Sequence, residues 1–246
     1  RWTVLEPGDD VAGLQSAAHA RSARGLLDEM ARHYRAPAQN VLVADRAGSI
    51  GIRSTGRYPV RPGDGSGLAV RDGATSASDW TGDLPVAAYP QAIDPAQGFL
   101  ASANQQPLDP RATRAYWGGS YDPWRALRIN ALLRADSSVT VDDMRRFQTD
   151  PGSERANVLV PRILDAARSA LARGRVADSA PVARAAALLA EWDRRYVRES
   201  ARAVLFEATM VALVSRTWDE LLEPDTLAAR PDGTKRPRRR VATPST

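Results

Sequence analysis

The sequence predicts an α+β fold, with a strand hairpin and long loops in the first half of the chain and helices in the second half. Short runs of β-branched residues flank Gly48, and segments rich in Gly, Pro, Asp and Ser follow as far as residue 95. After Trp117, apolar residues recur at the three- and four-residue spacing of helices. The length of 246 residues, 43% of them hydrophobic, suits one large globular domain or two small ones.

Composition excludes several classes of protein and chemistry. No apolar run reaches the roughly 20 residues that cross a bilayer, and the first residues do not resemble a signal peptide, so we expect no membrane partner. The absence of cysteine excludes disulfides, a thiolate nucleophile and cysteine zinc sites.

The net charge of +5 lies at the C-terminal end of the chain. Six of the 34 basic residues and one of the 29 acidic residues lie in 230–246, so 28 of each remain in the rest of the chain. We predict that 223–246 is a basic, disordered tail, because it lacks apolar periodicity. Nucleic acid is not the expected partner, because these cations do not belong to a folded face.

The first predicted elements are a helix over 10–34 and a hairpin. Asp9 or Asp10 would cap the helix, and Pro37 would end it by restricting the residue before it. The runs 40–45 and 49–53 around Gly48 predict two paired strands.

The region 55–95 predicts ordered loops or weak elements, held by isolated large apolar side chains. The run 98–103 then predicts a strand that leads directly into Asn104. The predicted helices of the second half are 123–133, 141–148, 160–173, 179–195 and 200–222. Thr140 and Asp143 form a capping-box pattern, with Asp in place of the usual Glu.

The common catalytic motifs are absent or have a simpler explanation. The two histidines, His19 and His33, lie on the first predicted helix away from any serine and aspartate partner, which argues against a catalytic triad. The segment 118–122 lacks the second glycine of a nucleophile elbow, and the glycine-rich segment 63–67 neither follows a strand nor opens a helix.

An ordered series of short motifs resembles the penicillin amidase (penicillin acylase) family of N-terminal nucleophile hydrolases, in part of the β-subunit. The resemblance covers about 1–222. The motifs are APAQN at 36–40, VLVAD at 41–45, GSIG at 48–51, GRYPVR at 56–61, DWTG at 79–82, LP at 84–85, DPAQG at 94–98, ASAN at 101–104, WRALRI at 124–129 and FQTD at 147–150.

The resemblance implies a partial αββα fold and a mechanism of amide hydrolysis by acyl transfer. In this family an N-terminal serine attacks the amide, and its own α-amine, which titrates near pH 8, serves as the base. Asn104 matches the asparagine that donates to the oxyanion, and Arg125 matches an arginine that supports the active site. The two residues should lie close together. The simpler alternatives are a turn residue for Asn104 and a surface ion pair for Arg125.

Several features depart from the family pattern. Arg1 has no nucleophilic side chain, so the expected nucleophile lies outside this chain, as do the α-subunit and the N-terminal part of the β-subunit that would be its partners. We expect no required cofactor. Many relatives hold a structural calcium after the asparagine, but Asp109 is followed here by Arg111, Arg114 and Ala115, so that site is not expected.

Two functions therefore remain open from the sequence. The first is a fragment of an amide-hydrolysing acylase, inactive alone, acting on a small acyl amide that the sequence does not identify, and periplasmic or secreted by resemblance. The second is a non-catalytic scaffold or partner-binding piece derived from the same fold.

Overall fold

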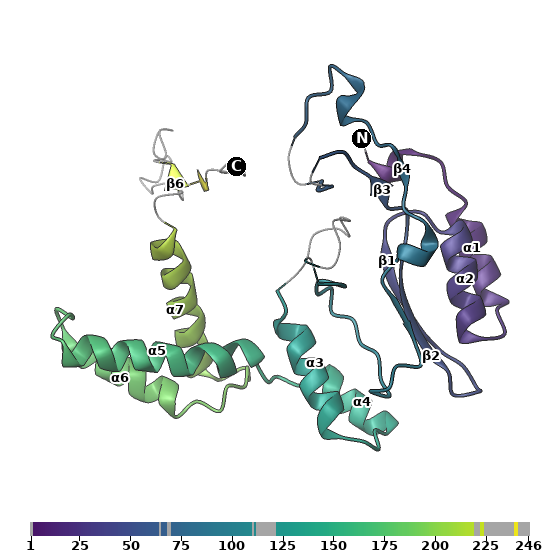
Figure 1. Cartoon of the computed structure of the whole chain (residues 1–246). Helices are drawn as coiled ribbons and strands as arrows, with labels where there is room; N and C mark the ends of the chain where they lie inside the picture. The colour runs from purple at the N-terminus through teal and green to yellow at the C-terminus, as the bar shows by residue number, and fades with distance from the viewer. Residues whose placement is uncertain are drawn as a thin grey trace, which may run out of the picture. The chain divides into compact units, whose positions relative to one another are not determined.

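The computed structural model describes residues 2–63, 65–67, 70–109, 111 and 122–218, together with the backbone of 222–223 and 239–240. The chain divides into two compact units, Arg1–Met144 and Arg145–Thr246, which are described separately (Figure 1). Within the described ranges, no helix is long and apolar enough to cross a membrane. The extent predicted from the sequence for the β-subunit-like domain, 1–222, stays a prediction.

The first unit opens with two helices, so the prediction of a single helix over 10–34 was wrong. A short 3-10 turn, Thr3–Leu5, precedes α1 (Asp10–Ala18) and α2 (Ala23–His33). The break has a local cause: Ser22 caps α2, and its Oγ accepts a hydrogen bond from the Gly25 N–H at 3.1 Å. The helix ends at His33, shortly before Pro37, as predicted.

The predicted hairpin is confirmed. Strands β1 (Gln39–Ala44) and β2 (Ile50–Thr55) are antiparallel, and Gly48 turns the chain with a φ of +90°. A third strand, β5 (Gln91–Ile93), pairs with the other edge of β2, which gives the order β1-β2-β5. This strand is one of the weak elements within the predicted loops, together with the β3–β4 pair (Pro59–Val60, Gly82–Asp83) and two 3-10 turns, Ser76–Ser78 and Val86–Ala88.

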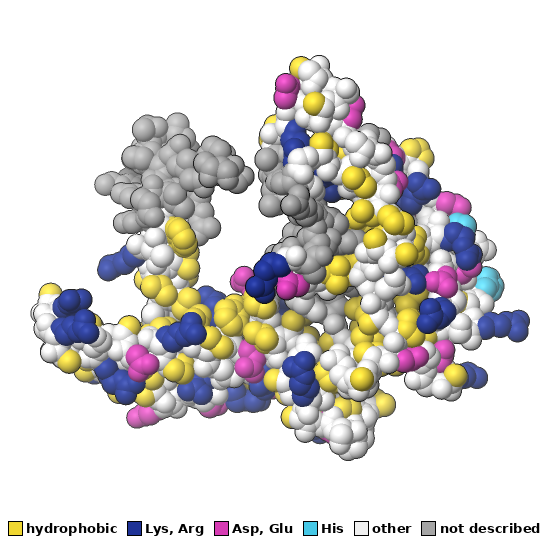
Figure 2. Space-filling view, viewed as in Figure 1, with side chains coloured by type: hydrophobic (Ala, Val, Ile, Leu, Met, Phe, Trp, Pro, Cys, Tyr) yellow, Lys and Arg dark blue, Asp and Glu magenta, His cyan; other side chains and the backbone are white. Residues whose placement is uncertain are grey.

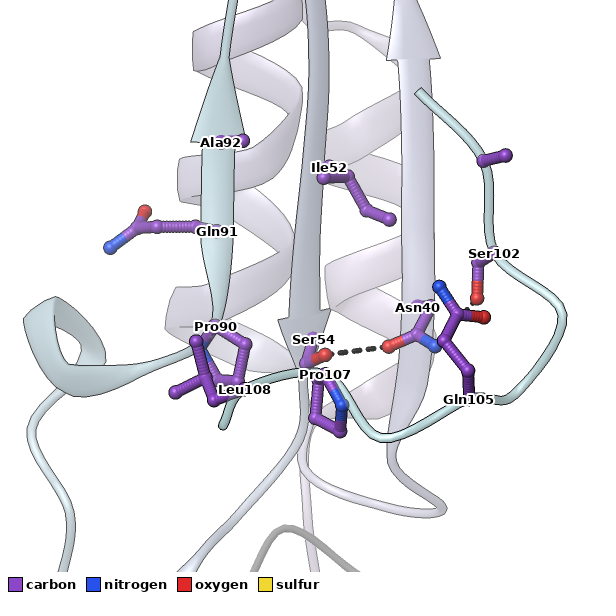
Figure 3. Close-up of a pocket in the computed structure, with 11 residues that line it drawn as sticks. Asn40, Ile52, Ser54, Pro90, Gln91, Ala92, Ser102, Gln105, Pro107 and Leu108 are labelled. Carbon is purple, nitrogen blue, oxygen red and sulfur yellow. Dashed lines mark hydrogen bonds between the residues drawn. The ribbon is translucent and has the colours of Figure 1, made fainter. Parts of the chain in front are cut away.

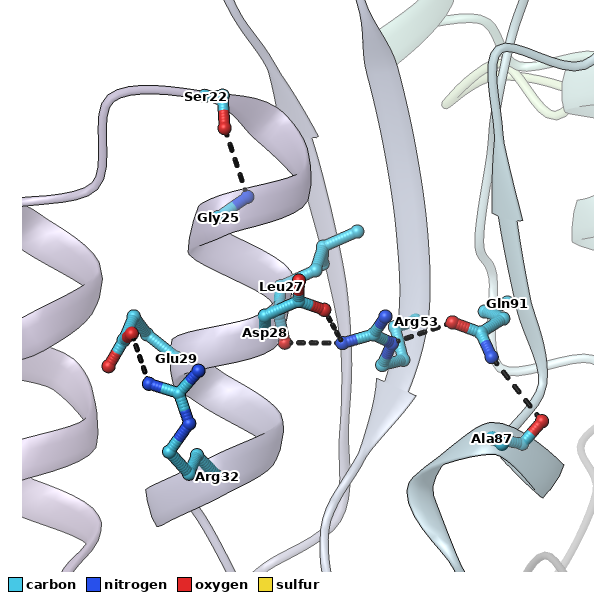
Figure 4. Close-up of polar contacts among 9 residues, drawn as sticks. All are labelled: Ser22, Gly25, Leu27, Asp28, Glu29, Arg32, Arg53, Ala87 and Gln91. Carbon is cyan, nitrogen blue, oxygen red and sulfur yellow. Dashed lines mark hydrogen bonds and ion pairs between the residues drawn. The ribbon is translucent and has the colours of Figure 1, made fainter.

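Helix α2 packs on one face of this sheet. Gly51 allows the close approach, because a Cβ there would lie only 2.8 Å from Leu27 Cδ1. Arg53, buried on β2, joins three elements, as Figure 4 shows. Its Nη1 donates to the Leu27 carbonyl at 2.7 Å and to Asp28 Oδ1 at 2.9 Å, and its Nε donates to Gln91 Oε1 at 2.9 Å. The guanidinium therefore holds α2 and β5 against β2.

We expect Arg53→Met to lower the free energy of unfolding of this unit by about 2–4 kcal/mol. The substitution keeps an apolar stem of similar length but leaves the buried Leu27 carbonyl and the Gln91 amide oxygen without their donor. Urea unfolding would measure the loss. Arg46→Met is the matched control, because Arg46 is exposed in the hairpin turn and should change stability by less than about 0.5 kcal/mol. Equal effects of the two variants would contradict the role of Arg53.

The predicted strand over 98–103 is absent: these residues form a bend at each end and an irregular loop between them. No described strand pairs with this segment; the Gly98 N–H donates to the Pro95 carbonyl at 2.9 Å, and the Ala103 N–H donates to Gln105 Oε1 at 2.8 Å. β-propensity alone was therefore misleading here.

The two helices that follow agree with prediction. Helix α3 (Trp124–Ala135) begins after Pro123, and α4 is Val141–Gln148. The capping box of α4 is confirmed: the Thr140 N–H donates to Asp143 Oδ2 at 2.7 Å, and the Asp143 N–H donates back to Thr140 Oγ1 at 3.3 Å.

The second unit contains three further helices whose ends differ from prediction. Helix α5 (Glu154–Ala172) begins six residues before the predicted start, because Ser153 caps it; Pro161 lies inside the helix and does not begin it. Helix α6 (Ser179–Ala190) ends earlier than predicted; beyond it, Arg194 has a φ of +61°. Helix α7 (Ala201–Thr217) also ends before the predicted residue 222.

A compact apolar cluster joins these three helices. Its centre is Phe206 of α7, fully buried against Trp192, with ring centroids 5.5 Å apart. Figure 2 shows that hydrophobic side chains also lie on the surface of α7, where Val204 and Val211 are exposed. The buried members of the cluster are Ala156, Val160, Leu189, Trp192, Ala203, Phe206 and Met210.

The predicted disordered tail, 223–246, lies mostly outside the described residues. Within the part described, the backbone of β6 (Leu222–Glu223) pairs with that of β7 (Arg239–Arg240). Residue 222, predicted as the last residue of a helix, thus lies in a two-residue strand.

Candidate functional site

The candidate site is built around Asn104, in the loop that follows β5. Ala103, directly before it, is buried and anchors the loop in the first unit. Asn104 itself is exposed and has a φ of +61°, in the left-handed region that asparagine tolerates better than most residues. The backbone therefore turns at Asn104 and presents its side chain at the surface.

Arg125 contacts Asn104, as the resemblance led us to expect. Arg125 is the second residue of α3, so the start of this helix positions its side chain. Its Nη2 donates to Asn104 Oδ1 at 3.0 Å and to the Ala103 carbonyl at 2.9 Å. One guanidinium nitrogen thus holds both the side chain of Asn104 and the peptide group that precedes it.

This contact determines which end of the Asn104 amide is available. Because Oδ1 accepts from a guanidinium, the amide NH₂ points away from Arg125. Nδ2 has no hydrogen-bond acceptor among the residues that the structure describes. An oriented, uncharged donor of this kind can stabilise negative charge that develops on a nearby oxygen.

A second set of polar side chains lies on the face of the sheet opposite α2 (Figure 3). Asn40 on β1 pairs across the sheet with Ser54 on β2. Ser54 Oγ donates to Asn40 Oδ1 at 2.6 Å, and Asn40 Nδ2 donates to Ser102 Oγ at 2.8 Å. These residues line a cavity of about 190 Å³, together with Ile52, Pro90, Gln91, Ala92, Ala101, Gln105, Pro107 and Leu108.

A titratable side chain, Tyr58, is hydrogen-bonded to Ser54 of this network. It is buried edge to face against Tyr89, with ring centroids 4.9 Å apart. Burial raises the pKa of Tyr58 to about 12, an effect to which the neighbouring Tyr89 adds. Tyr58 is therefore a neutral phenol at neutral pH and is not a candidate base.

Other residues considered in the sequence do not gather at the site. His33 lies 3.5 Å from Asp9 and 3.8 Å from Glu29, on the helical side of the sheet. Asp109 accepts from the N–H and the guanidinium of Arg111, and no group of three acidic, histidine or cysteine side chains suited to a metal occurs in the described part of the chain. Arg114 and Ala115, like most of the segment 118–122, lie outside the described residues.

Sequence reasoning did not identify the roles of Asn40, Ser54 and Ser102. Asn40 and Ser102 served only as parts of family motifs, and Ser54 was not considered. The signal was present, because a turn from Asp45 to Ser49 places residues 40 and 54 opposite each other. What the sequence did not reveal is that Ser102 meets this pair.

Comparison with known proteins identifies a family and several similar proteins. The family described as Penicillin amidase matches residues 1–244. Acyl-homoserine lactone acylase QuiP of Pseudomonas aeruginosa is 36% identical over 122 residues, half of this chain and 14% of the relative. QuiP of Pseudomonas syringae is 30% identical over 209 residues, 82% of this chain and 25% of the relative. Penicillin acylase 2 proenzyme of a Pseudomonas species is 32% identical over half of this chain and 16% of the relative.

A solved structure shows the same fold. The thermostable penicillin G acylase from Alcaligenes faecalis matches with a TM-score of 0.63 at 21% identity, over 90% of this chain and 41% of that one. The α+β class is thereby confirmed. The chain spans a quarter or less of the length of these curated relatives.

Proposed function

Because the chain belongs to the penicillin amidase family, we propose that it forms part of an acylase that hydrolyses amide bonds, with Asn104 as an oxyanion donor. The observation that carries the proposal is the contact between Arg125 Nη2 and Asn104 Oδ1 at 3.0 Å. It leaves the amide NH₂ as an oriented donor, which is the group that acyl transfer needs at this position.

In the proposed reaction, a serine hydroxyl from a segment outside these 246 residues attacks the amide carbon. Its α-amine takes the hydroxyl proton, and the carbonyl oxygen becomes an oxyanion that accepts a hydrogen bond from Asn104 Nδ2. The C–N bond then breaks, the α-ammonium protonates the leaving amine, and an acyl-enzyme remains. Water attacks this ester by the same route and releases the acid, which restores the serine.

The names of the relatives support a small acyl amide as the substrate. Two are named acyl-homoserine lactone acylases and one is named a penicillin acylase proenzyme, so each name refers to action on an acyl group. The proposed partners are the family's α-subunit and the rest of its β-subunit, and we propose a periplasmic location with them. This chain covers only a quarter or less of the length of each relative, which supports such an assembly.

The test is an assay of the chain assembled with the segments that carry the nucleophile. We expect release of phenylacetic acid from penicillin G or of a fatty acid from a long-chain acyl-homoserine lactone, measured by chromatography. Mass spectrometry of a quenched reaction should detect the acyl-enzyme. An assembled, folded protein that cleaves neither amide would contradict the acylase and favour the scaffold alternative.

We expect Arg125→Ala to lower kcat at least tenfold in this assay, because the Asn104 amide would lose the group that orients it. Arg125→Lys should lose less, since an ammonium can still donate to Oδ1. Arg134→Ala, at the exposed last turn of the same helix, is the matched control and should leave kcat unchanged. Full activity in Arg125→Ala would remove Arg125 from the site.

A further inference from the structure

We infer that Asn40 is a positioning residue that fixes the loop bearing Asn104 to the central sheet. The inference rests on the proposed function, because it concerns the same oxyanion donor. The observation behind it is the continuous series of hydrogen bonds from Ser54 through Asn40 to Ser102, two residues before Asn104.

The first step concerns the loop itself. Residues 99–105 belong to no strand or helix, and no described strand pairs with them. The loop is held at successive positions: Ser102 bonds to Asn40, the buried Ala103 carbonyl accepts from Arg125, and Asn104 Oδ1 accepts from the same guanidinium. Of these contacts, the one through Ser102 is the hydrogen bond that reaches the sheet.

The second step concerns the orientation of Asn40. Both ends of its amide are occupied, because Oδ1 accepts from Ser54 Oγ at 2.6 Å while Nδ2 donates to Ser102 Oγ at 2.8 Å. Ser54 is buried on the central strand β2, so it provides a rigid reference for the amide. Figure 3 shows Asn40 between the two serines, with Ser102 on the loop beside β1.

The third step concerns catalysis. An oxyanion donor acts only when it is held where the charge develops, and small displacements reduce the rate more than they reduce substrate binding. Arg125, on α3, orients the Asn104 amide, whereas the hydrogen bond from Asn40 to Ser102 joins the loop to strand β1 of the sheet. Arg125 therefore sets the orientation of the Asn104 amide, and Asn40 sets the position of the loop that bears it relative to β1 and β2.

The test compares Asn40→Leu, Ser102→Ala and the double variant in the assembled enzyme. We expect each single variant to lower kcat about tenfold with KM changed less than twofold, and the double variant to be no slower than the single ones. Gln39→Ala is the matched control, because Gln39 is the exposed neighbour of Asn40 on β1 and should leave kcat unchanged. Multiplicative losses in the double variant, or unchanged kcat in the single variants, would overturn the inference.

A second measurement needs no catalysis. The Ala103 amide, which donates to Gln105 Oε1, should exchange its hydrogen at least tenfold faster in Asn40→Leu and Ser102→Ala, while the amides of β1 and β2 keep their rates. An unchanged Ala103 rate would overturn the tether. If the wild type cleaves no amide, the proposed function fails and the positioning role fails with it. If Asn104→Asp is slow but Asn40→Leu is not, only the inference fails.

Discussion

Asn104→Asp is expected to lower kcat of the assembled enzyme by about 10²–10³-fold, the loss typical of one oxyanion-hole donor. The substitution is nearly isosteric, aspartate also tolerates the left-handed backbone at this position, and its carboxylate can still accept from Arg125. What changes is the group that Asn104 presents to the substrate: an NH₂ donor becomes an oxygen that carries charge and repels the oxyanion. Steady-state kinetics on penicillin G or an acyl-homoserine lactone would measure the loss.

The variant Asn104→Gly distinguishes the effect of losing the side-chain donor from the effect of changing the backbone conformation. Glycine adopts a φ of +61° without strain, so this variant keeps the turn and removes only the side chain. It should also lose at least tenfold in kcat, while circular dichroism of both variants stays that of the wild type. Wild-type turnover in either variant would show that Asn104 is a turn residue and not a donor.

Phe206→Ala is expected to lower the free energy of unfolding of the second unit by about 3–5 kcal/mol. The ring is fully buried at the centre of the cluster formed by α5, α6 and α7. It packs against Trp192, and the Arg155 guanidinium lies 5.6 Å from its centroid. Removing the ring leaves a cavity that these rigid neighbours cannot fill. Urea unfolding followed by tryptophan fluorescence would measure the change.

Val204→Ala is the matched control for this prediction. Val204 lies on the same helix, two residues before Phe206, but 69% of its surface is exposed. Its truncation should change the unfolding free energy by less than about 0.5 kcal/mol. Losses of similar size in the two variants would mean that the cluster does not carry the stability of this unit.

The elements that the sequence predicted well are those determined by neighbouring residues. The hairpin at Gly48 and the capping box at Thr140 depend on residues within a few positions of one another, and both are confirmed. Strand β5 has only three residues and exists because β2 offers it an edge, which no local pattern reveals. The strand wrongly predicted at 98–103 is the converse case, because its residues favour a strand but no described strand pairs with them.

The site was predictable to a similar extent. Family motifs identify Asn104 and Arg125, and the resemblance also predicts their contact. Their catalytic roles remain predictions. Asn40 and Ser54 lie opposite each other by the register of a predicted hairpin, yet their link to Ser102 depends on a loop closure over 62 residues. Contacts of that range follow from the whole fold, not from local sequence.

The bond from Asn40 to Ser102 also has a consequence for the order in which the protein folds. The β1–β2 hairpin joins residues that are close in the chain, so its closure costs little entropy and can occur early. The Asn104 loop can bind only to an Asn40 that the hairpin has already aligned with Ser54. We therefore expect the loop with Asn104, the proposed oxyanion donor, to take its place after the hairpin has formed, because before that it lacks the hydrogen bond between Ser102 and Asn40.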